Sequence, residues 1–126
     1  MIQQQTILKI YDNSGAKKAK CIKVLGGCKK KSAGVNDVVV VSVKELRNKA
    51  KKISKVKKGE VHRALILHTK TKQTNKDGSI FFSDSNTVCL ITKQFKPIGS
   101  RITGPVSKKL KKGKYSKFVN ISLGTF

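Results

Sequence analysis

The stretch from Val56 to Ile91, VKKGEVHRALILHTKTKQTNKDGSIFFSDSNTVCLI, decides the fold that the rest of the chain must join. Both of its arms are rich in Val, Ile and Leu, and the pair Asp77-Gly78 between them tolerates the positive φ of a tight turn. The stretch therefore predicts one long β-hairpin. Lys70, Lys72 and Lys76 crowd its tip, and such charges cannot be buried without counter-charges. We expect the arms to join a core and the tip to face a polyanion.

The apolar residues elsewhere also favour β-structure. They are mostly Val, Ile and Leu in short runs, without Trp, which is typical of a small barrel or sandwich. The run VVVVSV at 38–43 is the strongest strand, and its β-branched side chains predict burial on both faces or near a barrel interior. Residues 7–11 and 17–25 predict two further strands, with Ile22 and Val24 facing inward in the second. The predicted fold class is mainly β.

The segment KELRNKAKKISKVKK at 44–58 interrupts this pattern. It has too few apolar residues to bury a helical face, so it predicts a solvated loop that is disordered when the protein is alone. The alternative is a loop that orders only against phosphate. The sequence leaves both interpretations open.

The C-terminal part combines a shaped loop with helical signals. Residues 97–105 contain two Pro and two Gly, and the second Pro suits the first position of a short helix over 105–110. Tyr115, Phe118 and Val119 then recur at helical spacing. They predict a second short helix whose face packs on the rest of the fold; base stacking is the alternative role for these aromatic residues.

Net charge narrows the class of partner. The chain carries +23, from 29 basic against 6 acidic residues, and such a density of like charge normally requires a polyanion to offset self-repulsion. An acidic membrane surface would call for an amphipathic helix or a lipidation signal, and we find neither, so nucleic acid is favoured. Only three of the basic residues are Arg, which favours phosphate and shape recognition over base reading. Codon bias in an A+T-rich genome explains the lysines equally well.

The residues for catalysis are sparse. Six carboxylates and two His are available, and no nucleophile elbow, P-loop or zinc-protease motif occurs. Asp12, Asp37, Asp77 and Asp84 all lie next to turn residues, where a short carboxylate ordinarily binds local backbone. We expect no enzyme and no cofactor.

The cysteines have no paired spacing. Cys21, Cys28 and Cys89 match neither a zinc pattern nor a disulfide framework, so we expect reduced thiols and no metal. The start MIQQQTILKIYDN has neither an apolar signal core nor an Arg/Ser-rich presequence, and no window is long and apolar enough to predict a membrane span.

Several segments, taken together and in order, carry a specific resemblance. They are MIQQQT at 1–6, DNSGAKKAKCIKVLGG at 12–27, AGVNDVV at 33–39, VKKGE at 56–60, ALIL at 64–67, DGS at 77–79 and PIGSRITGPV at 97–106. The chain resembles the universal large-subunit ribosomal protein fourteen family in its bacterial and organellar form. The resemblance implies a five-stranded β-barrel with one or two short C-terminal helices. We expect one domain over 1–126, with the barrel over about 1–95 and the C-terminal loop and helices over about 96–126.

The resemblance also implies partners and sites. They are large-subunit rRNA, small-subunit rRNA at intersubunit bridges, the neighbouring large-subunit proteins three and nineteen, and the ribosomal silencing factor on the bridge face. The rRNA-binding residues that we expect are Asn13, Ser14, Lys17, Lys18, Lys20, Lys29, Lys30, Lys31, Lys55, Lys57, Lys58, Lys70 and Lys72. The bridge residues that we expect are Lys44, Arg47, Lys49, Ser100, Arg101 and Lys117.

Two questions stay open at this level. Lysine richness and the lack of a presequence favour the mitochondrial matrix, on a ribosome whose protein is organelle-encoded, over a bacterial cytoplasm or a plastid. The alternative to a ribosomal constituent is a free nucleic-acid-binding barrel with a regulatory or architectural role, which would dissociate from RNA with a steep dependence on salt.

Overall fold

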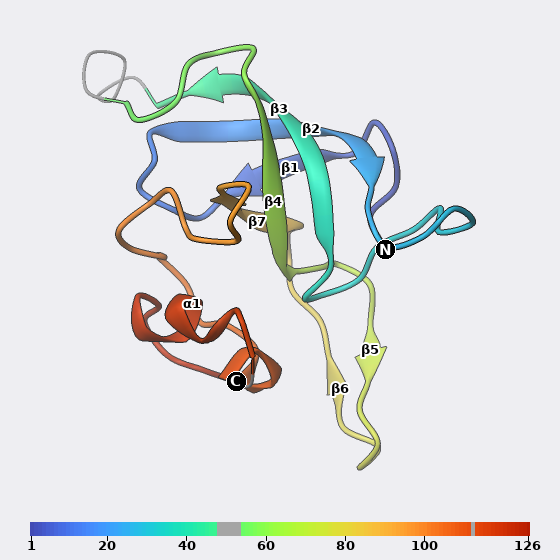
Figure 1. Ribbon diagram of the computed structural model, residues 1–126. Helices are drawn as coiled ribbons and strands as arrows, with labels where there is room; N and C mark the ends of the chain where they lie inside the picture. The colour runs from blue at the N-terminus through green and yellow to red at the C-terminus, as the bar shows by residue number, and fades with distance from the viewer. Residues whose placement is uncertain (48–53, 112) are drawn as a thin grey trace.

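The computed structural model describes residues 1–47, 54–111 and 113–126, and its main feature is a closed β-barrel (Figure 1). Neighbouring strands follow the order β1-β2-β3-β4-β7, and a parallel pair of β1 with β7 closes the barrel, with Ile10 opposite Val88. The other pairs are antiparallel. The strands are β1 (Ile7–Ile10), β2 (Ala16–Val24), β3 (Val38–Leu46), β4 (Val61–His68) and β7 (Thr87–Ile91). The expected five-stranded barrel is confirmed.

The strand β3 shows how the barrel interior is filled. Val39, Val41 and Val43 point inward and are fully buried, whereas Val38 and Val40 on the other face are half-buried. Alternation along a strand produces this split, because successive side chains point to opposite faces. The run of Val therefore lines a barrel interior, one of the two environments predicted for it.

The inward residues of β2 differ from the prediction at one position. Val24 is buried as predicted, but Ile22 is 38% exposed, and the inward positions before it are Ala19 and Cys21. The ladder with β3 shifts register between Cys21 and Lys23. This irregularity inserts an extra residue, so the inward set passes from Cys21 to Val24 and Ile22 turns outward. The prediction for Ile22 was wrong because a bulge is invisible in strict alternation.

The predicted hairpin from Val56 to Ile91 is confirmed, in two ladders. Its arms β4 and β7 belong to the barrel, and beyond them β5 (Gln73–Thr74) and β6 (Ile80–Phe81) form a two-stranded extension away from the barrel (Figure 1). Gly78 has φ of 81°, as the predicted turn requires.

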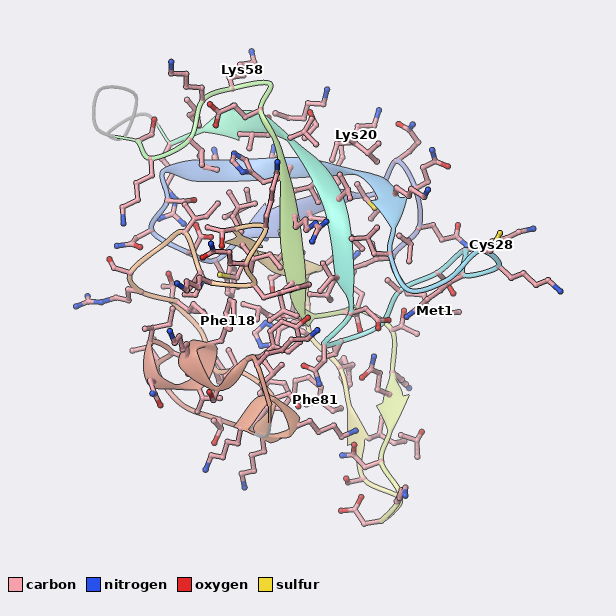
Figure 2. The ribbon with its side chains drawn as sticks, in the orientation of Figure 1. Met1, Lys20, Cys28, Lys58, Phe81 and Phe118 are labelled. Atoms are coloured by element: carbon pink, nitrogen blue, oxygen red, sulfur yellow. The ribbon has the colours of Figure 1, made fainter. Side chains whose placement is uncertain are left out.

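The C-terminal segment packs beside the barrel over a second apolar cluster. The helix α1 (Ser116–Asn120) buries Phe118 completely, and Tyr115 and Val119 pack against the same cluster, so the predicted helix and core packing are confirmed (Figure 2). The helix predicted over 105–110 was wrong. A single 3-10 turn, η2 (Lys108–Lys111), replaces it. Val106 stays extended because its amide donates to Gly124 O at 2.9 Å.

The segment 44–58 is more ordered at its two ends than predicted. Residues 44–46 continue β3, and Val56 is 1% exposed inside the barrel core. Residues 48–53, where a solvated loop was predicted, lie outside the described part of the chain. No helix among the described residues has the length and apolar character needed to cross a membrane.

Candidate nucleic-acid interface

A fully buried carboxylate organises the turn between β1 and β2. Asp12 Oδ1 accepts hydrogen bonds from the amide and the hydroxyl of Ser14, and its Oδ2 accepts one from the amide of Leu90 at 2.8 Å. Asp12 also pairs with Ile102 in an isolated bridge. Because donors satisfy both oxygens, the buried charge is tolerated and the turn is held against β7.

The next side chain joins this turn to the loop that follows β7. Asn13 Oδ1 accepts from the amides of Ser100 and Arg101 at 2.8 and 3.1 Å, and its Nδ2 donates to Ser100 Oγ at 2.8 Å. Gly99 permits this approach, since a Cβ there would lie 2.8 Å from Asp12 Cβ and 2.9 Å from Asn13 Oδ1. Asn13, which we expect to contact rRNA, therefore forms one hydrogen-bonded unit with Ser100 and Arg101, which we expect at a bridge.

A lysine-bearing turn borders the same unit. The Lys55 amide donates to Ser14 O at 3.0 Å, and Lys55 Nζ donates to Ile98 O at 3.3 Å. Since Val56 is anchored in the core, the adjacent Lys57 and Lys58 are presented to solvent (Figure 2).

Glu60, in the same turn as Lys57 and Lys58, accepts its hydrogen bonds from groups close to it in the sequence. Glu60 Oε2 accepts from the Lys57 amide at 2.9 Å and from His62 Nε2 at 3.0 Å. The Lys57 amide first, and His62 second, lower the pKa of Glu60. Glu60 is therefore ionised at neutral pH and shapes the turn that displays Lys57 and Lys58.

Basic side chains also line a pocket of about 370 Å³ beside the turn between β1 and β2. Arg47 Nη2 donates to Ile10 O at 3.3 Å and the Arg47 amide to Gly15 O at 2.9 Å, so its guanidinium is held at the pocket wall. Lys18 pairs with Glu45 at 3.1 Å, which offsets one charge. A concave site with this excess of cations suits a phosphate group. The lining residues are Lys9, Ile10, Tyr11, Lys17, Lys18, Arg47 and Thr103.

Sequence reasoning missed four lining residues of this pocket, one of which is Ile10, whose carbonyl oxygen accepts from Arg47. Lys9 lies outside on β1, where the alternation of β1 could have indicated it. Tyr11 and Thr103 come together through the hydrogen bond from the Thr103 amide to Tyr11 O at 2.8 Å, a contact between distant parts of the chain that no local signal reveals.

Strand direction explains why these groups gather. The ends of β1, β3 and β7 and the starts of β2 and β4 lie at one end of the barrel, since β1 is antiparallel to β2 and parallel to β7. We call this region the cationic barrel end. Its polar and basic residues are Lys9, Asn13, Lys17, Lys18, Arg47, Lys55, Lys57, Lys58, Ser100 and Arg101.

The other expected site residues are placed elsewhere. The loop with Lys29, Lys30 and Lys31, between β2 and β3, and the hairpin residues Lys70 and Lys72 belong to the opposite end of the barrel. Four more remain. Lys20 lies on the barrel wall opposite Ile7 and Ser42, and Lys117 is exposed on α1. Lys44 is exposed near the end of β3, next to the turn that carries Lys57 and Lys58, and Lys49 lies outside the described residues.

Besides Asn13, Lys18 and Lys55, two further expected RNA contacts have internal partners in the structure. Ser14 is fully buried, with its hydroxyl bonded to Asp12, so it can act on RNA only by holding the turn. Lys30 Nζ pairs with Asp37 Oδ1 at 2.8 Å, and both side chains are about one third exposed.

Residues 1–125 match the model of a protein family described as Ribosomal protein L14p/L23e. The chain belongs to this family. As an L14p/L23e protein it is a structural constituent of the large ribosomal subunit, with rRNA and ribosomal proteins as partners. This membership favours a ribosomal constituent over a free nucleic-acid-binding module, and a structural role over a catalytic one.

The thiols of this L14p/L23e protein lie apart from the cationic barrel end. Burial raises the pKa of Cys21 and raises that of Cys89 well above its usual value, while Cys28 is exposed in the loop after β2. Among the described residues, no group of three or more His, Cys, Asp and Glu side chains is arranged to hold a metal ion.

Proposed function

We propose that the cationic barrel end binds the phosphate backbone of large-subunit rRNA. The observation that carries this proposal is the convergence of basic side chains from β1, β2, the end of β3 and the turn before β4 on a rigid edge. The carboxylates beside them, Asp12 and Glu60, bind backbone amides and leave most of the positive charge for a ligand.

Backbone recognition follows from the chemistry of these groups. Most are lysines, which bind phosphate as mobile point charges and carry no base-specific geometry. Asn13 and Ser14 hold the turn from which Lys17 extends, so they contribute by position. The second set of expected contacts, Lys20, Lys29, Lys30, Lys31, Lys70 and Lys72, would neutralise further rRNA phosphates around the wall and the opposite end.

We infer a separate role for the flank of the cationic barrel end that carries Ser100 and Arg101. The loop that holds them is fixed by Asn13, and the bond from the Ile102 amide to Ile121 O ties it to the end of α1, the helix that carries Lys117. Together with Arg47, Lys44 and Lys49, these residues are proposed to contact small-subunit rRNA in a bridge. The family resemblance supports this assignment.

The remaining partners and the compartment are proposed on the same resemblance. Large-subunit proteins three and nineteen would lie beside the protein, and the ribosomal silencing factor would compete for the bridge flank. The proposed compartment is the mitochondrial matrix, with the bacterial cytoplasm and the plastid as alternatives.

The experiment is incorporation of a charge-reversed variant into large subunits. Lys57→Glu/Lys58→Glu should lower the amount that co-sediments with the large subunit by about tenfold or more, because each lost phosphate contact costs roughly 1 kcal/mol. Its melting temperature should stay within about 3 °C of the wild type, since exposed charges add little to stability.

A matched control reverses two exposed lysines elsewhere on the protein. Lys23→Glu/Lys111→Glu changes the net charge by the same amount outside the cationic barrel end and should co-sediment nearly as well as the wild type. Equal losses for both variants would indicate a nonspecific effect of net charge. An equal loss of melting temperature and of incorporation in the double variant would mean that Lys57 and Lys58 serve the fold instead.

A further inference from the structure

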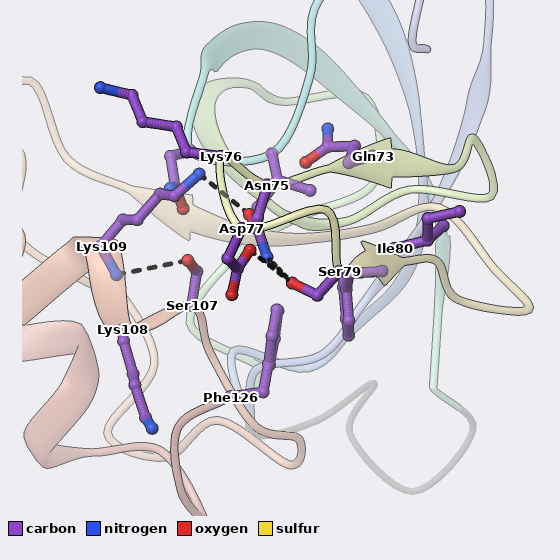
Figure 3. A pocket seen from close by; sticks show the side chains of 13 residues that line it. Gln73, Asn75, Lys76, Asp77, Ser79, Ile80, Ser107, Lys108, Lys109 and Phe126 are labelled. Carbon is purple, nitrogen blue, oxygen red and sulfur yellow. Dashed lines mark hydrogen bonds between the residues drawn. The ribbon is translucent and has the colours of Figure 1, made fainter.

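The hairpin extension and the C-terminal segment enclose a groove of about 800 Å³ at the opposite end of the barrel (Figure 3). Its size lies within the range of sites that hold a small ligand. Side chains from three separate parts of the chain form its walls. They are Val35 and Asn36 before β3, Gln73, Asn75, Lys76, Asp77, Ser79, Ile80 and Phe81 from the hairpin, and Ser107, Lys108, Lys109 and Phe126 from the C-terminal segment.

An aromatic pair provides the apolar part of the groove. Phe81 and Phe126 are stacked, with ring centroids 3.9 Å apart and an interplanar angle of 14°. His68 supports them from the barrel side, with its ring 5.5 Å from that of Phe126. Because the His68 nitrogens are held by Pro105 O and Thr87 Oγ1 at 2.8 Å each, this platform has a fixed position.

A chain of hydrogen bonds connects the two walls. Lys109 Nζ donates to Asn75 Oδ1 at 3.4 Å, Asn75 Nδ2 donates to Ser79 Oγ at 2.9 Å, and Ser79 Oγ donates to Asp77 Oδ1 at 2.9 Å (Figure 3). The Ser79 hydroxyl is the main cause of a lowered pKa at Asp77, which therefore remains a carboxylate acceptor. The walls are thus aligned by the protein itself before a ligand enters.

One acceptor on the groove wall is unsatisfied. Asn36 Oδ1 is buried and has no hydrogen-bond partner among the described residues. Asn36 has φ of 73°, a left-handed conformation that asparagine adopts more readily than most residues. An unpaired buried acceptor is costly, so a rotation of the Asn36 amide toward the groove that pairs it with an N–H or O–H of a ligand would be favoured.

We propose that this groove holds one unstacked nucleotide of RNA. The base would pack on the Phe81–Phe126 pair, donate from its polar edge to Asn36 and Asp77, and leave its phosphate at the rim. Lys76, Lys108 and Lys109 lie at that rim, and Asp77 is the one carboxylate among the lining residues. This excess of positive charge favours a polyanionic ligand over a peptide with few acidic residues. The inference rests on the proposed function, because the nucleotide would belong to rRNA.

The test is ultraviolet cross-linking of large subunits that contain the full chain, followed by nuclease and trypsin digestion and mass spectrometry. Stacked bases cross-link to the side chains that they touch, so we expect mononucleotide adducts on the tryptic peptides of residues 77–93 and 118–126, which carry Phe81 and Phe126. Adducts near Lys17 and Lys18 report separately on the cationic barrel end.

Two pairs of variants sharpen the result. Asn36→Gly keeps the backbone conformation and removes the acceptor, whereas Asn36→Asp keeps an acceptor; adducts should fall about threefold to tenfold in the first and persist in the second. Lys109→Glu should lower them to a similar extent, and Lys23→Glu, at an exposed position on β2 outside the groove, should not.

Subunits that give adducts near Lys17 and Lys18 but none on either phenylalanine peptide would overturn the inference while leaving the proposed function intact. A density map of the particle with a protein side chain seated in the groove would overturn it as well. A protein absent from the large-subunit peak would instead contradict the proposed function.

Discussion

The substitution Asp12→Asn tests whether a buried carboxylate positions the cationic barrel end. In the wild type, one oxygen of Asp12 accepts from the Ser14 amide at 3.0 Å and from its hydroxyl, and the other accepts from the Leu90 amide at 2.8 Å. Asparagine has a single acceptor oxygen, so an N–H donor must face either the Ser14 or the Leu90 amide. One buried amide then loses its partner.

The expected loss can be estimated from these contacts. An unsatisfied buried amide costs about 1–3 kcal/mol, and the loss of charge assistance in the surviving bonds adds about 1 kcal/mol. The free energy of unfolding should therefore fall by about 2–4 kcal/mol. For a domain of this size each kcal/mol corresponds to roughly 4 °C, so the melting temperature should fall by about 8–16 °C.

The measurement is thermal unfolding by circular dichroism in enough salt to screen self-repulsion. Asp84→Asn, which removes an exposed carboxylate, is the matched control and should melt within about 2 °C of the wild type. Since the Asp12 turn carries Asn13 and Lys17, the variant should also incorporate poorly into large subunits at temperatures where it remains folded. A melting temperature for Asp12→Asn equal to that of the control would refute the proposed role of this carboxylate.

Three further outcomes follow from the same structure. Gly99→Ala should lower the free energy of unfolding by about 1–3 kcal/mol in denaturant titrations, because its Cβ would press on the Asp12 turn, and a neutral result would show that the loop yields freely. Burial, opposed by the bond to Pro105, lowers the pKa of His68 from 6.5, so the folded protein keeps a neutral ring where the unfolded chain takes a proton. The contribution of His68 to the free energy of unfolding is therefore complete above about pH 6.5 and decreases as the pH falls toward the pKa of His68 in the folded protein. His68→Gln should make the melting temperature less dependent on pH between about pH 7 and pH 5; an unchanged dependence would show that other groups cause it. Ile22→Lys should cost less than about 0.5 kcal/mol and Val24→Lys more than about 3 kcal/mol, whereas similar costs would contradict the bulge in β2.

The sequence predicted what depends on local patterns. The Val run of β3, the Asp77-Gly78 turn and the helical spacing of Tyr115, Phe118 and Val119 each report a period or a turn preference that short segments carry by themselves. The prediction that five strands close into a barrel came from the family resemblance. The pairing of β1 with β7 joins residues almost eighty positions apart, so it leaves no periodic signal in the sequence.

The errors share a physical cause. Pro105 is compatible with a helix start, but the amide of Val106 finds a better partner in Gly124 O, which only the folded C-terminal segment provides. Ile22 is displaced by a bulge whose position depends on the facing strand. The pocket with Tyr11 and Thr103 likewise needs the connection between residues 11 and 103. Local sequence predicts elements, while long-range hydrogen bonds decide where each element ends and which side chains meet.

The distribution of the few carboxylates explains how so basic a chain can be both folded and available to RNA. Within the described residues, Asp12, Glu60 and Asp77 accept from backbone amides or hydroxyls, and lysine ion pairs occur at Lys18 and Lys30. The acids thus stabilise turns and neutralise little of the net charge of +23. Repulsion among the uncompensated lysines lowers the stability of the isolated protein, and under the proposed function phosphate binding would relieve that repulsion only in the folded state, where the lysines are held at two ends of one barrel. Binding to the native state alone stabilises it by mass action, so rRNA bound in the proposed way would act as a ligand that adds to the free energy of unfolding.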